Sequence, residues 1–315
     1  DTQRATRNTQ HALCIALIAI LFVSLFATAR AYFGDYARAD TTAYWFEDGA
    51  EALAGEVNRF MGAGWDGDRM LHTGSSEGES TVPSDPRSYL EPSLWETWTS
   101  LRFLVGETSR VHLLPSNGDW PAIDGGPAAI FVWPYGNWRR VWSMPTEPIE
   151  ISVVEGALSQ GDRDPEPFNT YRAFYITPSQ PVYPPLVRFQ DGVELVDVRV
   201  RIVDQGVGVE LLWHATESLP DDYTVFVHYV RDGERIGQHD AQPAGGHYPT
   251  SRWNAGDLVH DNHLMALSSP PDPARYQIIL GLYRAADGQH LDVLDEAENT
   301  AGNFVVLPVT VVEKP

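Results

Sequence analysis

The stretch with the most varied chemistry lies late in the chain. Residues 245–257 read GGHYPTSRWNAGD and place two aromatic rings, an imidazole, a guanidinium and a carboxylate among turn-forming residues. Aromatic faces beside polar side chains are typical of small-ligand sites. The alternative is a long crossover in which an aromatic ring fills the core and the glycines permit tight turns. On the first interpretation the ligand-binding residues are His247, Tyr248, Arg252, Trp253 and Asp257.

A second candidate is the pair of imidazoles in His260-Asp261-Asn262-His263. Side chains three apart in a strand point to opposite faces, so these two could share a metal ion only in a turn. The surrounding pattern predicts a strand, and we therefore predict no metal site. The single cysteine, Cys14, lies in an apolar run and allows no disulfide.

Motifs for cofactors and nucleophiles are missing from the sequence. It contains no Walker loop, dinucleotide-binding glycine pattern, Gly-x-Ser-x-Gly elbow or His-Glu-x-x-His. We therefore predict no cofactor and assign no catalytic residue.

Acidic side chains outnumber basic ones, with 43 Asp and Glu against 22 Lys and Arg and a net charge of −21. Such a surface repels phosphate backbones, so nucleic acid is excluded as a partner. Pairs such as Glu47 with Glu51 arise by chance at this density, and none is assigned as general acid and base. An exported hydrolase would need a carboxylate pair brought together by the tertiary structure.

Tryptophan is concentrated in one region, with six of the ten residues between Trp95 and Trp142. A sugar site would need exposed Trp or Tyr faces flanked by carboxylates and amides. Core packing or docking onto a membrane partner explains the same enrichment.

The element in front of these regions is an uncharged run of eighteen residues, Ala12 to Ala29. At about 1.5 Å per residue it nearly spans a bilayer core, and we predict a transmembrane helix over about residues 12–33 within a 1–40 segment. A cleavable signal peptide remains the alternative, because Arg4 and Arg7 precede the run and Ala27-Thr28-Ala29 fits a cleavage site. Both place the bulk of the chain outside the cell membrane.

Residues 41–160 are expected to form a small α/β domain with a short, mostly parallel sheet. A Pro-rich linker at 161–185 follows, and residues 186–315 predict an antiparallel β-sandwich of immunoglobulin-like or jelly-roll type, giving an α+β multidomain chain. Asp-Gly pairs at 232–233 and 287–288 predict two hairpins. The predicted helices are 41–62, 93–104 and 137–143, and the strands are 110–114, 128–133, 149–154, 193–203, 207–215, 223–231, 234–241, 258–267, 276–284, 290–293 and 303–312.

Two stretches carry a resemblance to a known family. The apolar helix running into Thr28-Ala29-Arg30-Ala31-Tyr32-Phe33-Gly34-Asp35-Tyr36-Ala37, followed by an amphipathic helix, resembles the last transmembrane helix of GT-C membrane glycosyltransferases. These are of the protein mannosyltransferase and aminoarabinose transferase type. The pattern Tyr223 to His228, Gly245-Gly246 to Trp253, and Gly281-Leu282-Tyr283 is similar to the C-terminal sandwich of such bacterial proteins, notably in Chloroflexota.

The resemblance implies that this chain is the C-terminal part of an enzyme that transfers sugar from a polyprenyl-phosphate carrier. The family's catalytic carboxylate lies upstream of the matching segment, so no catalytic position is carried over. The expected partners are the lipid bilayer, a glycan or polypeptide acceptor, and other membrane subunits. The alternative is a single-pass anchored extracytoplasmic binding module or accessory subunit. A run of hydrophobic segments encoded before Asp1 would favour the transferase.

Overall fold

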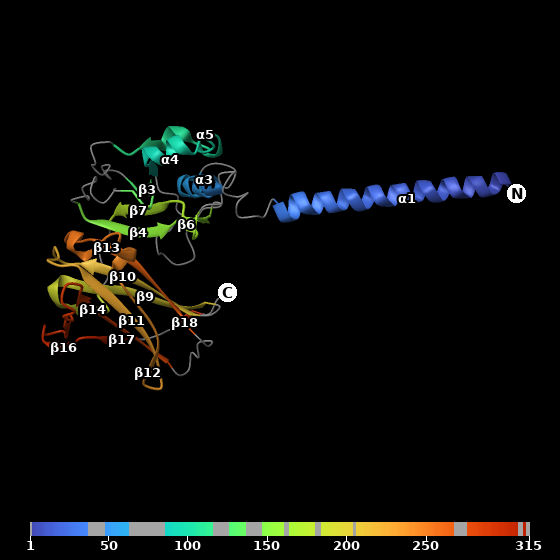
Figure 1. The fold of residues 1–315 in the computed structure, drawn as a ribbon. Coiled ribbons are helices and arrows are strands. Elements are labelled where there is room, and N and C mark those ends of the chain that lie inside the picture. The colour runs from blue at the N-terminus through green and yellow to red at the C-terminus, as the bar shows by residue number, and fades with distance from the viewer. Residues whose placement is uncertain are drawn as a thin grey trace.

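The computed structural model describes residues 2–36, 48–62, 86–115, 126–136, 147–160, 164–179, 184–203, 206–267, 276–307 and 311–312. It shows a mostly β protein with few helices and one large mixed sheet, consistent with the expected α+β class (Figure 1). The short helix expected at 137–143 lies outside the described residues.

The first element is the long helix α1 (Thr2–Arg30), which continues as a π-helical segment, η1 (Ala31–Tyr36). Figure 1 shows α1 directed away from the rest of the chain. Its described side chains begin at Ile15, and apolar ones such as Leu21 and Phe26 are exposed. Among the described residues there is no helix whose length and apolar content suffice to span a membrane. The side chains of residues 12–14, including Cys14, lie outside the described part.

The large sheet has the order β16-β15-β8-β9-β10-β13-β4-β7-β3-β1-β2, with β18 beside β9. Five of its strands lie within residues 87–178 and seven within residues 187–312. Their bounds are β1 (Arg87–Leu90), β2 (Val111–Leu113), β3 (Ala128–Val132), β4 (Ile149–Glu155), β7 (Arg172–Pro178), β8 (Val187–Phe189), β9 (Val193–Val203), β10 (Gly206–Ala215), β13 (Leu258–Ala266), β15 (Val293–Leu294), β16 (Thr300–Gly302) and β18 (Val311–Val312).

The expectation of a mostly parallel sheet is wrong. Strand β1 does pair in parallel with β2 and β3, but β7 lies antiparallel between β3 and β4. Strand β7 comes from the predicted linker at 161–185, where an apolar run is bracketed by prolines. It is buried on both faces: Phe174 and Ile176 enter one core, while Ala173 and Tyr175 enter another. This burial on two sides accounts for its continuous apolar sequence.

A smaller sheet has the order β12-β11-β14-β17, from β11 (Tyr223–Arg231), β12 (Glu234–Ala241), β14 (Tyr276–Arg284) and β17 (Val305–Leu307). Its side chains meet those of the large sheet in one hydrophobic core that contains Trp213 from β10 and Tyr229 from β11. The predicted hairpin between β11 and β12 is confirmed. Asp232 and Gly233 both have positive φ, as a two-residue turn of the primed type requires.

Helices cover the other face of the β3, β4 and β7 region. The amphipathic helix α3 (Asp48–Met61) buries Leu53 and Val57 there, within the range predicted for it. The helix expected at 93–104 is instead two, α4 (Pro92–Thr97) and α5 (Leu101–Leu104), because Trp98 leaves helical geometry. The remaining short elements are η2 (Thr108–Arg110), β5 (Leu158–Ser159), β6 (Phe168–Asn169), η3 (Gln190–Gly192), η4 (Pro243–Gly246) and η5 (Thr250–Arg252).

A short ladder joins the strands before residue 180 to those after it. Strand β13 pairs in parallel with β4 through Leu258 with Glu150 and Val259 with Ile151. The segment at 161–185 therefore does not separate two sheets, since strands from both of its sides belong to the same one. The candidate site lies just beyond the end of this β4–β13 ladder.

Candidate functional site

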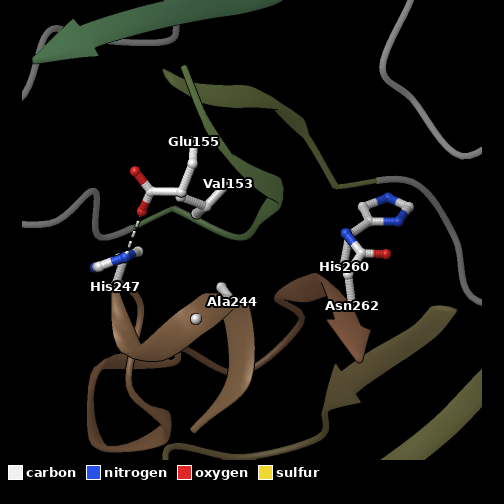
Figure 2. Close-up of a pocket in the computed structure, with 7 residues that line it drawn as sticks. Val153, Glu155, Ala244, His247, His260 and Asn262 are labelled. Carbon is white, nitrogen blue, oxygen red and sulfur yellow. Dashed lines mark hydrogen bonds and ion pairs between the residues drawn. The ribbon is translucent and has the colours of Figure 1, made fainter. Parts of the chain in front are cut away.

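A pocket of about 140 Å³ opens beyond the paired residues of β4 and β13. We call it the wedge pocket, and Figure 2 shows Glu155 and His247 on one side of it, with His260 and Asn262 on the other. The short turn η4 packs against both strands and closes the floor. The lining residues are Val153, Glu155, Ala244, Gly245, His247, His260 and Asn262.

The topology explains why polar side chains gather there. Because β4 and β13 run parallel, the residues that follow the paired ones lie at the same end of both strands. In open α/β sheets, ligands bind in the crevice outside the carboxyl ends of the strands. Glu155 ends β4, and Asn262 follows the paired part of β13.

Glu155 is the most heavily bonded group of the wedge pocket. Its Oε1 lies 2.9 Å from Nε2 of His247 and 2.7 Å from a guanidinium nitrogen of Arg172, and its Oε2 accepts the Asn169 amide at 3.2 Å. Burial acts to raise the pKa of Glu155, but the hydrogen bonds and charges of His247 and Arg172 outweigh it and lower the pKa. The carboxylate is therefore held ionised, which suits an acceptor of hydrogen bonds from a ligand and not a proton donor.

The opposite wall comes from β13. Nε2 of His260 lies 2.7 Å from Oε1 of Glu150, and the side chain of Asn262 is exposed two residues further on the same face. His263 points to the other face and is buried, so the strand separates the two imidazoles as its alternation predicts. Within the described part of the chain, no three His, Cys, Asp or Glu side chains are placed to hold a metal ion.

A buried polar chain supports the floor of the pocket from below. Asp261 accepts the backbone N–H of Ala244 at 3.1 Å, and its other oxygen lies 2.8 Å from Nε2 of His263. Trp213 donates its indole N–H to the same oxygen at 3.2 Å. Nδ1 of His263 in turn lies 2.8 Å from Nδ1 of His239 on β12. These bonds hold η4 in place and connect it to both sheets.

The predicted ligand loop is mostly internal. Trp253 is 1% exposed, and its indole donates to the carbonyl of Tyr248 at 3.0 Å. Tyr248 donates its hydroxyl to Asp257 at 2.6 Å, and Asp257 accepts the N–H of Ile149 at 2.9 Å. Burial and the nearby Asp257 raise the pKa of Tyr248 far above its usual range.

Of the five predicted site residues, the structure brings only His247 to the wedge pocket. Arg252 is exposed outside it, while Tyr248, Trp253 and Asp257 fix the loop against the start of β4. This matches the alternative interpretation, in which Trp253 fills the core.

Sequence reasoning missed Glu155, His260 and Asn262 as parts of one site. A usable signal existed for Glu155, because a charged residue directly follows the apolar run of β4. For His260 and Asn262 the signal was their alternation with buried residues along β13.

No protein-family model matches the chain, and no curated protein matches it. A beta-glucuronidase from glycoside hydrolase family 2 is similar over 44% of this chain and 16% of its own length, at 10% identity and a TM-score of 0.22. Chicken MD-1 complexed with lipid IVa is similar over 39% of this chain and 97% of its own length, at 12% identity and a TM-score of 0.20.

An endonuclease/exonuclease/phosphatase from Beutenbergia cavernae is similar over 50% of this chain and 35% of its own length, at 16% identity and a TM-score of 0.20. The chain thus spans less than a fifth of the glucuronidase. With TM-scores this low, none of the three likenesses enters the functional argument.

Proposed function

We propose that this chain is the exported C-terminal part of a membrane glycosyltransferase and that its wedge pocket holds the acceptor. On this proposal α1 anchors the chain in the bilayer and the two sheets form a sandwich of immunoglobulin-like or jelly-roll type. The upstream part of the enzyme supplies the sugar from a polyprenyl-phosphate carrier and the carboxylate base. The observation that carries the proposal is the wedge pocket itself.

The groups around the pocket suit a neutral, hydroxyl-rich ligand. The ionised Glu155 accepts hydrogen bonds, the Asn262 amide both donates and accepts, and an imidazole can do either. Each titratable group already has a charged or polar neighbour: Glu155 has Arg172 and His247, and His260 has Glu150. A ligand therefore need not supply a counter-charge, which favours hydroxyl or amide groups over ions.

The pocket is held by strands and not by a loose loop. Two residue pairs join β4 to β13, and Asp257 ties the N–H of Ile149 to the loop that carries His247. Such support keeps polar groups at fixed separations, which lowers the entropic cost of binding a ligand. This fits a role in selecting an acceptor.

The test is acceptor binding by the full chain in lipid nanodiscs, on arrays of glycans and polypeptides. We expect His260→Ala to weaken binding of the captured acceptor by about tenfold, the worth of one good hydrogen bond. The matched control is His214→Ala, because His214 forms the same kind of pair, 2.9 Å from Glu194, away from the pocket.

Two results would overturn the proposal. One is capture of no acceptor of either class, and the other is an equal effect of His260→Ala and His214→Ala. A further variant, Asn262→Ala, tests the exposed amide without disturbing an ion pair.

A further inference from the structure

Three aromatic side chains gather next to Glu155, and we call them the aromatic ledge: Trp133, Tyr135 and Phe168. Their ring centroids lie 5.7 to 6.4 Å apart with interplanar angles of 65° to 70°, so each ring meets the others edge to face. This is a favourable arrangement for aromatic rings and fixes their positions. Tyr135 is nevertheless 63% exposed.

The ledge is connected to the wedge pocket by hydrogen bonds. The backbone N–H of Asn169 donates to the hydroxyl of Tyr135 at 3.2 Å, and the Asn169 amide donates to Oε2 of Glu155 at 3.2 Å. Oε1 of the same carboxylate faces His247. Glu155 thus contacts His247 in the pocket and is linked to Tyr135 of the ledge through Asn169.

The turn that carries Tyr135 is braced from two sides. Glu91 accepts the N–H of Trp133 at 2.6 Å, and Arg172 donates to the carbonyl of Pro134 at 3.4 Å while also binding Glu155. Arg172 is 8% exposed and so links the two regions from beneath. An exposed ring is therefore held rigidly in place instead of packing into a core.

We propose that the ligand of the wedge pocket is an oligosaccharide and that a neighbouring pyranose ring stacks on Tyr135 of the aromatic ledge. A pyranose has an apolar face of C–H groups and a rim of hydroxyls. The apolar face of the sugar stacks on the exposed Tyr135 ring. Its hydroxyls form hydrogen bonds with the carboxylate of Glu155 and the amide of Asn169. The proposal deepens the proposed function and rests on it.

The chemistry around Tyr135 favours a sugar over an apolar protein segment. An apolar side chain of a partner protein would cover the Glu155 carboxylate and the Asn169 amide without offering them a hydrogen bond beyond those that they already make. A sugar offers hydroxyls to both groups while its apolar face covers the ring.

The experiment measures binding of unbranched mannose and glucose oligosaccharides of one to four units to the full chain in nanodiscs. We expect the affinity to rise with the number of sugar units, and we expect Tyr135→Ala to weaken binding of the four-unit sugar about tenfold more than binding of the monosaccharide. Tyr135→Phe should keep most of the gain because the ring remains. Phe103→Ala, on a ring that is 88% exposed on α5, is the matched control and should change nothing.

The proposal would be overturned if the affinity still rose with oligosaccharide length in both Tyr135→Ala and Phe168→Leu. The thermal unfolding profile checks that each variant is folded. An affinity that does not rise with length would also overturn the proposal. If monosaccharides or polypeptides still bind in a manner sensitive to His260→Ala, the proposed function survives the failure of this inference. Capture of no acceptor at all removes both.

Discussion

At the scale of single residues, Asp257 shows how a buried charge can serve the site without touching a ligand. It is fully buried and accepts three hydrogen bonds, from Tyr248, Asn254 and Ile149. Burial raises the pKa of Asp257, although these hydrogen bonds act in the opposite direction. The carboxylate holds the first residue of β4 next to the loop that presents His247 to the pocket.

We therefore expect Asp257→Ala to lower the free energy of unfolding by about 3 kcal/mol, because it leaves buried donors without an acceptor. Urea unfolding of the full chain in detergent, followed by tryptophan fluorescence, measures the loss. Asp295→Ala is the control, since Asp295 also accepts backbone N–H groups, from Ala297 and Asn299, but does so in an exposed turn. Equal losses for the two variants would show that burial of Asp257 is not what matters.

At the scale of elements, the contact between β12 and β13 joins the small sheet to the large one through two imidazoles. His239 and His263 face each other at 2.8 Å, and Asp261 lies behind His263. Burial lowers the pKa of His239, and the neighbouring His263 lowers it further, while Asp261 and Asp240 oppose the shift. The folded state thus prefers the neutral imidazole at this contact.

The sign of the resulting pH dependence follows from linkage. A histidine whose pKa is lower when folded stabilises the fold fully above its unfolded value of 6.5, and this stability is lost as the pH falls through the folded value. We expect the urea concentration at the unfolding midpoint to decrease as the pH is lowered from about 7.5 to about 5. The decrease should be smaller in His239→Gln. An identical fall in both proteins would mean that other groups, such as the carboxylates, cause it.

At the scale of the whole molecule, α1 and the β region differ sharply in surface chemistry. The chain carries a net charge of −21, yet α1 exposes large apolar side chains along most of the stretch from Ile15 to Phe26. An exposed apolar surface of this kind is unfavourable in water and is expected to be covered by lipid in the proposed function.

We expect the purified full chain to float with phosphatidylcholine liposomes in a density gradient. The double variant Ile18→Lys with Phe22→Lys should remain at the bottom, because each charge at the centre of a membrane helix costs about 3 kcal/mol. Leu264→Lys with Phe304→Lys, on two exposed apolar residues of the β region, is the matched control and should float. Flotation of all three proteins would contradict anchoring by α1.

Much of the β region could be predicted from local pattern. The bounds of β9, β11, β12 and β14 equal those predicted, because a period of two in apolar residues and an Asp-Gly turn are local signals. The predicted helix at 41–62 contains α3 for the same reason, since its apolar residues recur at helical spacing. Strand β1, by contrast, has only four residues and was not predicted.

The sequence by itself determined the mostly β character of the second half, its hairpin at 232–233 and the strand that separates His260 from His263. Only the tertiary structure decided that β7 enters the middle of the sheet, that β4 pairs with β13, and that Glu155 meets His247 across 92 residues of chain. Local periodicity reports which face of a strand is buried but not which strand lies beside it. Partner choice depends on contacts between residues far apart in the chain, and the wedge pocket and the aromatic ledge exist only because of such contacts.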